Sequence, residues 1–263
     1  MATASIARPL RDRAVLRLLW RVPALLMWVA GGCFWAAVMM RILGRSGRRV
    51  SVRVFARGVL FLCGVRFDRQ QAGELPSPCL VVSNHVSWLD IYVLHALEPM
   101  TFIAKSQIRS WPVIGWLVTA AGTLYIERGR RHAVHDVLHQ AQRRCDLGER
   151  ICFFPEGTTS EGHGLLKFHS NLFSLVERRP DLLVQPISIR YWQQGLASSV
   201  TAYVGEMTLV GSMLRIMRTP GLSVSPIFHS PIHFGELAQP NRRTLSDEAY
   251  ARILAGLSIG QRA

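Results

Sequence analysis

A histidine and an aspartate, His85 and Asp90, stand five positions apart in the segment SNHVSWLD at residues 83–90. On a regular helix five steps turn the side-chain direction by ~500°, so the two side chains would point ~140° apart. If His85 instead precedes the helix, its ring can fold over the first turn, where Asp90 can accept the Nδ1 proton. Such a carboxylate fixes the tautomer and leaves Nε2 as a base that can deprotonate a hydroxyl.

The same spacing also fits a structural explanation. Ser87 and Asp90 have capping-box spacing, with the serine at the N-cap and the acid at the third helical position. Asp90 would then satisfy backbone donors at a helix start, and His85 would be an ordinary loop residue. The H-x4-D pattern by itself therefore leaves both interpretations open.

The elements around these residues predict an α/β fold. Short apolar runs alternate with segments of helical periodicity, an order typical of a mixed, largely parallel sheet flanked by helices. The predicted strands are 79–85, 100–105, 122–128, 150–157 and 182–192, and the predicted helices are 87–97, 108–121, 131–148 and 246–257. Ser246 is the predicted cap of the last helix. Residues 193–243 read as β-rich pieces whose order is not predicted. Ligand-binding groups are expected where strands end and helices begin.

The N-terminal region predicts contact with a membrane. Residues 22–40 run for nineteen positions without a charge, which matches a ~30 Å hydrocarbon core. We expect an uncleaved membrane segment that spans the bilayer or dips into one leaflet; a buried soluble helix and a cleaved signal are the alternatives. Residues 51–66 predict a second, amphipathic or interfacial helix. The chain therefore divides into membrane-anchoring helices at 1–66 and an α/β domain at 67–263.

The charge of the chain is concentrated in the same region. Of the net formal charge of +14, residues 1–57 contribute +10, from eleven arginines and one acid, Asp12. Because these arginines flank the apolar run, they favour anionic lipid headgroups over nucleic acid as the partner. The five cysteines form no C-x-x-C motif, which indicates small apolar residues in a reducing compartment.

Four blocks in order resemble the glycerolipid acyltransferase family, the 1-acylglycerol-3-phosphate acyltransferases, whose bacterial members also carry an N-terminal helix pair. The similar blocks are NHVSWLD (84–90), GTLYIER (122–128), FPEGTTS (154–160) and VQPISI (184–189). The resemblance covers about residues 67–192. It implies direct transfer of a fatty acyl group from acyl-CoA or acyl carrier protein to a lysolipid hydroxyl, without an acyl-enzyme, cofactor or metal.

The resemblance also implies roles for particular residues. His85 would be the general base, and Asp90 would orient it. Arg128 would contact the acceptor's phosphate, for which a guanidinium fork is suited, although a surface salt bridge is the alternative. Glu156 would belong to the acceptor site, where it would hydrogen-bond glycerol hydroxyls or position Arg128; otherwise it is a turn residue paired with an arginine.

Further candidates lie beside these residues. Gly157 permits a close approach of backbone N–H groups to an anion, and Thr158 offers a hydroxyl. Lys105 and Lys167 are expected to contact phosphate of the acceptor or donor, unless they are solvated surface charges. Asn84 and Ser87 complete the expected substrate-binding set, and backbone N–H groups of 84–88 are expected to stabilise the oxyanion.

The expected acceptor is lysophosphatidic acid, which would give phosphatidic acid in phospholipid biosynthesis. Lyso-ornithine lipid is the alternative acceptor, and a non-catalytic membrane scaffold or nucleic-acid binder is the alternative from a different class. The absence of a G-x-S-x-G elbow in the sequence disfavours a serine nucleophile. His132, His135 and His139 are expected to form an ordinary polar helix face and not a metal site. We expect the enzyme at the inner membrane, with its active site on the cytoplasmic side.

Overall fold

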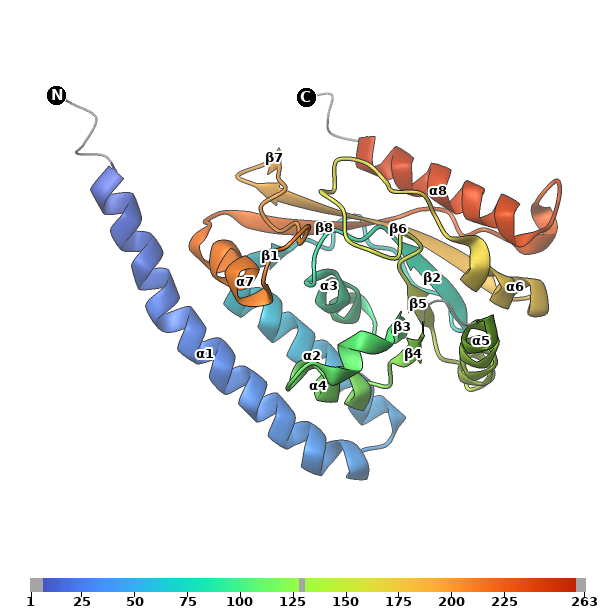
Figure 1. Cartoon of the computed structure of the whole chain (residues 1–263), viewed down its shortest axis with the longest axis horizontal. Coiled ribbons are helices and arrows are strands. Elements are labelled where there is room, and N and C mark those ends of the chain that lie inside the picture. The colour runs from blue at the N-terminus through green and yellow to red at the C-terminus, as the bar shows by residue number, and fades with distance from the viewer. Residues whose placement is uncertain (1–6, 128–130, 259–263) are drawn as a thin grey trace.

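A mixed sheet forms the centre of the computed structural model, which describes residues 7–127 and 131–258 (Figure 1). Its strands are β1 Val65–Phe67, β2 Cys79–Ser83, β3 Thr101–Lys105, β4 Leu124–Ile126, β5 Ile151–Phe153, β6 Leu183–Gln193, β7 Leu196–Ala197 and β8 Leu222–Phe228. They lie in the order β1-β8-β6-β2-β5-β3-β4, with β7 beside β6. Only β7 and β8 run antiparallel to β6, and all other neighbours are parallel. The predicted α/β class with a largely parallel sheet is confirmed.

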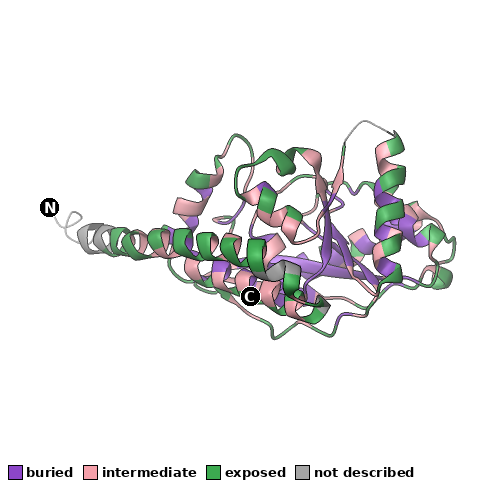
Figure 2. Ribbon diagram, turned by 90° about the horizontal axis from the view of Figure 1, so that it is seen from below, coloured by how far each residue is buried: buried purple, intermediate pink, exposed green. Residues whose placement is uncertain are grey.

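Helices cover both faces of the sheet. The α-helices are α1 Ala7–Ile42, α2 Arg45–Cys63, α3 Asp90–Leu97, α4 Ile114–Ala120, α5 Arg131–Asp146, α6 Ser174–Arg178, α7 Leu209–Arg218 and α8 Arg242–Ser258, and the short 3₁₀ helices are η1 Ser106–Ser110, η2 Ser170–Phe173 and η3 Phe234–Glu236. One core cluster lies between the sheet and α2, α3 and α7, and a second lies between the sheet and α5, α6 and α8. Figure 2 shows the strands buried between these layers.

The second N-terminal helix, predicted at 51–66, begins earlier, at Arg45, and ends earlier, at Cys63. Gly64 adopts a left-handed backbone with φ 76°, and its N–H donates to carbonyl groups in the last turn of α2. The helix therefore stops at Cys63. The next residues form β1, which pairs in parallel with β8. Val65 and Arg66 therefore belong to the sheet, while the proposed domain division at residue 66 stays a prediction.

Further helices differ from the prediction, and α3 begins at Asp90, three residues after the predicted start. The segment 108–121 is broken, because η1 ends at Ser110 and α4 begins only at Ile114, after Val113 with φ 62°. The last helix, α8, begins four residues before Ser246, and Asn241 Oδ1 caps it by accepting the N–H groups of Arg243 and Thr244. The helix α7 lies in the stretch that was expected to be only β-rich.

The long helix α1 packs against the body of the molecule from about Arg17 onward, and its N-terminal end extends beyond the body (Figure 2). Arg21 donates to the carbonyl of Met217 in α7 at 2.8 Å, and Trp28 Nε1 donates to the carbonyl of Phe55 in α2 at 3.1 Å. Away from the cavity α1 also exposes apolar side chains, such as Leu26 at 63% and Phe34 at 70%. By length and composition, the part Arg13–Val38 is sufficient to cross a membrane.

Candidate active site

The site begins where β2 ends. All five residues of β2 are buried between neighbouring strands β5 and β6. Beyond Ser83 the side chain of Asn84 continues the pairing, because its Nδ2 donates to the carbonyl of Ile189 at 2.9 Å and its Oδ1 accepts the N–H of Ile189 at 2.7 Å. The amide thus replaces a backbone partner, and the main chain is free to turn at His85.

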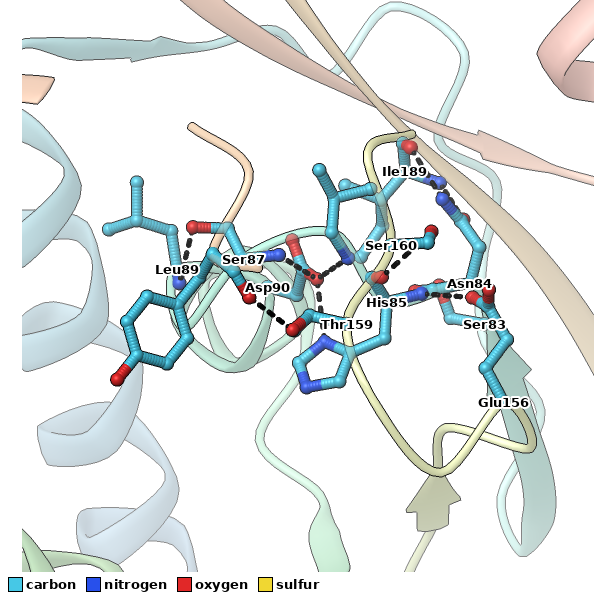
Figure 3. Close-up of polar contacts among 12 residues, drawn as sticks. Ser83, Asn84, His85, Ser87, Leu89, Asp90, Glu156, Thr159, Ser160 and Ile189 are labelled. Carbon is cyan, nitrogen blue, oxygen red and sulfur yellow. Dashed lines mark hydrogen bonds and ion pairs between the residues drawn. The ribbon is translucent and has the colours of Figure 1, made fainter. Parts of the chain in front are cut away.

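The turn places His85 over the first turn of α3. His85 Nδ1 lies 2.8 Å from Asp90 Oδ2, and the Asp90 side chain is fully buried (Figure 3). The same oxygen accepts the backbone N–H groups of Val86 and Ser87, at 2.7 and 2.9 Å. Asp90 is therefore both the carboxylate at a helix start and the partner of the imidazole. The predicted N-cap Ser87 is wrong, because α3 begins at Asp90, after Leu89.

A fourth donor reaches the other oxygen of Asp90. Tyr191, on β6, donates its hydroxyl to Asp90 Oδ1 at 2.7 Å. Burial and the adjacent carboxylate raise the pKa of Tyr191 well above its ordinary value, so the phenol keeps its proton and remains a donor. A buried carboxylate needs such donors, because an unpaired charge in this environment would be strongly disfavoured.

The segment after β5 holds the histidine from the opposite side. Glu156 Oε1 accepts the backbone N–H of His85 at 2.7 Å, and the carbonyl of His85 accepts the N–H of Ser160 at 2.8 Å (Figure 3). The ring of Phe154 stacks on the imidazole with centroids 3.9 Å apart. The main chain and the ring face of His85 are thus held by residues about seventy positions later in the sequence.

Glu156 contacts the main chain of the protein, and its expected contact with the acceptor or with Arg128 stays a prediction. Its second oxygen, Oε2, accepts the N–H of Leu166 at 2.9 Å, and the residue is buried. Burial raises the pKa of Glu156, while the two backbone N–H donors oppose that rise. Both carboxylate oxygens are therefore occupied by the main chain of the protein, and neither pairs with an arginine side chain in the described part of the chain.

A cavity of about 1180 Å³ opens beside the imidazole. Its wall is mainly apolar and is built by α1, α2, α3, η1 and α4 together with the turns after β3 and β5. His85 lines it, and so do three other predicted residues, Lys105, Gly157 and Thr158. Gly157 has φ 67°, a left-handed conformation that glycine adopts without strain.

Other predicted residues do not reach this cavity. Asn84 is buried and both groups of its amide are paired, and Ser87 is buried with its hydroxyl 3.3 Å from the N–H of Leu89. Their side chains therefore support the turn and are not available to a ligand, which corrects that expectation. Lys167 is exposed and does not line the cavity. Arg128 lies outside the described residues.

The remaining histidines and cysteines show no metal-binding arrangement within the described residues. No group of three or more His, Cys, Asp or Glu side chains among them is placed to hold a metal ion. His132, His135 and His139 are exposed on α5, as expected of a polar helix face. Cys63, Cys79, Cys145 and Cys152 are buried thiols.

Sequence reasoning missed Tyr191, Phe154 and Ser160. Phe154 and Ser160 lie at the two ends of the block FPEGTTS, and Tyr191 follows VQPISI by two residues. The available signal for Tyr191 was alternation along β6, since Ile187, Ile189 and Tyr191 share one face of that strand. Which residue would meet that face depends on β6 lying beside β2.

Known proteins are similar to this chain in sequence and in fold. The family model described as Acyltransferase matches residues 65–190. A lyso-ornithine lipid O-acyltransferase of Pseudomonas aeruginosa is 35% identical over 210 residues, which cover 78% of this chain and 81% of that protein. A 1-acyl-sn-glycerol-3-phosphate acyltransferase of Neisseria meningitidis is 33% identical over 181 residues, covering 68% and 70%. In fold, the chain is similar to the crystal structure of the LPA acyltransferase PlsC from Thermotoga maritima, with a TM-score of 0.69, 18% identity and coverage of 97% and 98%.

Proposed function

The chain belongs to the acyltransferase family and is an O-acyltransferase of the lysolipid type, and on that premise we propose that His85 is the base that activates the acceptor's hydroxyl. The observation that carries this proposal is the position of the imidazole. Asp90 binds Nδ1, so Nε2 is the ring nitrogen left for chemistry, and the ring lines a large apolar cavity that suits lipid chains.

The reaction is a direct transfer. His85 Nε2 takes the proton of the acceptor's hydroxyl, and the hydroxyl oxygen attacks the carbonyl carbon of an acyl thioester. The carbon–sulfur bond then breaks, and the imidazolium returns the proton to the leaving thiolate. Asp90 stabilises the imidazolium between these two steps. The donor is acyl-CoA or acyl carrier protein, and no acyl-enzyme forms.

For the acceptor we propose lyso-ornithine lipid first. The Pseudomonas relative, whose name gives lyso-ornithine lipid as its substrate, has higher sequence identity and coverage than the Neisseria relative. Ornithine in a lyso-lipid carries a carboxylate and one free amine, because its other amine is in the amide that holds the lipid chain. The cavity wall includes a cation, Lys105, and an anion, Glu127; Lys105 pairs in register with Ile126, and Glu127 follows Ile126. A zwitterionic headgroup suits such a pair.

Lysophosphatidic acid, the acceptor expected from the sequence, is the second candidate. Its support is the name of the Neisseria relative and the name of the Thermotoga structure. In this case Lys105 would contact the phosphate, and the role of Arg128 as a second phosphate ligand stays a prediction.

We also propose that the enzyme binds one leaflet of the inner membrane from the cytoplasmic side. The support is that α1 is attached over residues 21–35, to α7 through Arg21 and to α2 through Trp28 and Trp35. A helix held against the body in this way can insert its exposed apolar side chains into a leaflet while the cavity stays beside the lipid. Figure 2 shows α1 largely exposed.

The test is acyl transfer from labelled acyl-CoA to a panel of lysolipids by the purified full-length chain bound to vesicles. We expect product with lyso-ornithine lipid or lysophosphatidic acid, and the ratio of kcat/KM values ranks them. His85→Ala should abolish product and still float with vesicles. Full activity of His85→Ala would refute the mechanism, and conversion of neither acceptor would refute the proposed substrates.

A further inference from the structure

Two polar side chains interrupt the apolar wall of the cavity. Tyr92 and His95 are three residues apart on α3, so they share one face of that helix, and both line the cavity. Their surroundings are aromatic. The ring of Tyr92 packs against Phe55 and Trp88, and the ring of His95 packs edge-on against Phe102 with centroids 4.9 Å apart.

His95 has an unsatisfied hydrogen-bonding atom. The residue is only 6% exposed, and its Nδ1 is buried without a partner. Burial lowers the pKa of His95 to about 4, so the ring is neutral near pH 7, with one nitrogen as donor and the other as acceptor. A half-turn about Cβ–Cγ preserves the outline of the ring and exchanges Nδ1 with Cδ2, so the nitrogen can turn toward a ligand.

Tyr92, the second polar residue of this wall, is half-buried. Within the described residues its hydroxyl makes no hydrogen bond with the protein, and burial raises its pKa to about 12, so it stays a neutral phenol. A buried polar atom without a partner, such as Nδ1 of His95, is unfavourable. This nitrogen, with the phenol of Tyr92 beside it on the same cavity wall, indicates a ligand that supplies hydrogen-bond partners.

We infer that Tyr92 and His95 form a polar subsite that hydrogen-bonds a hydroxyl group on a lipid chain held in the cavity. A hydroxyl is suited to both groups, because it donates and accepts at once. The inference rests on the proposed function, since the chain bound there would be that of the acyl donor or of the acceptor. Tyr92 and His95 would then determine which lipid chains the enzyme selects.

The subsite lies close to the chemistry. At a rise of ~1.5 Å per residue, His95 is ~7 Å along α3 from Asp90, which holds the base. The rings of Phe154 and Phe102 connect the two histidines, since Phe154 stacks on His85 and Phe102 contacts both Phe154 and His95. The hydroxyl is therefore expected near the reacting end of the chain and not at its far end.

The test is a competition between matched chains. In the donor arm, equal amounts of β-hydroxymyristoyl-CoA and myristoyl-CoA compete for one acceptor; in the acceptor arm, lysophosphatidic acids with and without a β-hydroxyl on their acyl chain compete for one donor. The product ratio is measured by mass spectrometry. We expect a preference for the hydroxylated chain of about two- to tenfold, the size of one or two neutral hydrogen bonds, in the arm that supplies the bound chain.

The variants make the test specific. Tyr92→Phe and His95→Phe should each bring the ratio toward one, whereas Ile91→Val, which alters an apolar residue of the same wall on the same helix, should leave the ratio unchanged. Tyr92→Phe removes a single oxygen, so it tests the inference even if His95→Phe fails to fold. A ratio of one in both arms for the wild type, or an unchanged ratio in both variants, would overturn the inference. Absence of any product in the wild type would instead refute the proposed function.

Discussion

The carboxylate of Glu156 accepts the backbone N–H of His85 at 2.7 Å, across seventy-one positions of sequence. The glutamate of the third motif therefore acts on the histidine of the first motif, through the main chain. Ser160 of the same segment donates its N–H to the carbonyl of His85, so both backbone groups of His85 are fixed. Much of this motif thus positions the base, which the separate sequence blocks did not indicate.

Replacement of Glu156 by glutamine should impair this support. One carboxylate oxygen becomes an NH₂ group that faces the N–H of His85 or of Leu166, so one buried donor loses its acceptor, at a cost of about 1–3 kcal/mol. We expect the melting temperature to fall by ~3–10 °C and kcat to fall more than the acceptor KM rises. Glu161→Gln, at an exposed position of the same loop, should change neither. If Glu156→Gln raised the acceptor KM and left the melting temperature unchanged, Glu156 would contact the acceptor directly.

Asp90→Asn tests the orientation of the imidazole. The amide keeps one acceptor oxygen but cannot stabilise an imidazolium as a carboxylate does. We expect kcat to fall by about 10²–10⁴-fold. Because both residues act in one proton transfer, the double variant with His85→Ala should be hardly less active than His85→Ala alone. Steady-state kinetics checks this, and losses that multiply in the double variant would show that the two residues act independently.

Tyr191→Phe removes the donor to Asp90 Oδ1 without a change of shape. The buried oxygen then lacks a partner, so we expect a loss of stability of about 1–3 kcal/mol, measured by chemical denaturation. Since the imidazole remains paired with Oδ2, kcat should fall only by about two- to tenfold. Tyr250→Phe, on α8, is the matched control for the loss of a phenol. An unchanged stability of Tyr191→Phe would contradict the assigned contact.

Burial of His95 predicts a dependence of stability on acidity. Its pKa is lowered from 6.5 to about 4 in the folded state, so between these values the unfolded chain binds a proton that the folded chain does not. Protonation of the unfolded chain at His95 therefore favours unfolding below pH ~6.5 and has no effect above it. At pH 5 it lowers the free energy of unfolding by about 2 kcal/mol. Melting temperatures of the wild type and His95→Gln at pH 7 and pH 5 measure it. If the melting temperatures of the wild type and of His95→Gln decreased equally between pH 7 and pH 5, groups other than His95 would cause the acid sensitivity.

The exposed apolar side of α1 should carry membrane binding. Phe34→Glu exchanges a 70% exposed apolar side chain for a charge, so we expect the affinity for anionic vesicles to fall by about tenfold or more in a flotation assay. Leu254→Glu, on the remote helix α8, is the control that should still float. Unimpaired flotation of Phe34→Glu would exclude this face as the membrane contact.

The sequence by itself determined the local features. The apolar runs around 79–83 and 183–193 predict buried strands, and the H-x4-D pattern with three further blocks predicts the chemistry, because both depend on neighbours along the chain. Boundaries were less certain where two signals compete. The start of α8 at Arg242 was missed because Asn241 and Ser246 are both residues that cap helices.

Only the tertiary structure decided how these features act together. Tyr191 reaches Asp90 because β6 lies beside β2, and Asn84 is occupied by Ile189 for the same reason. The unpaired groups of Tyr92 and His95 become informative only once α1, α2 and α4 enclose a cavity around them. Strand order and helix packing bring together residues that are far apart in sequence, and neither periodicity nor spacing along the chain records such contacts.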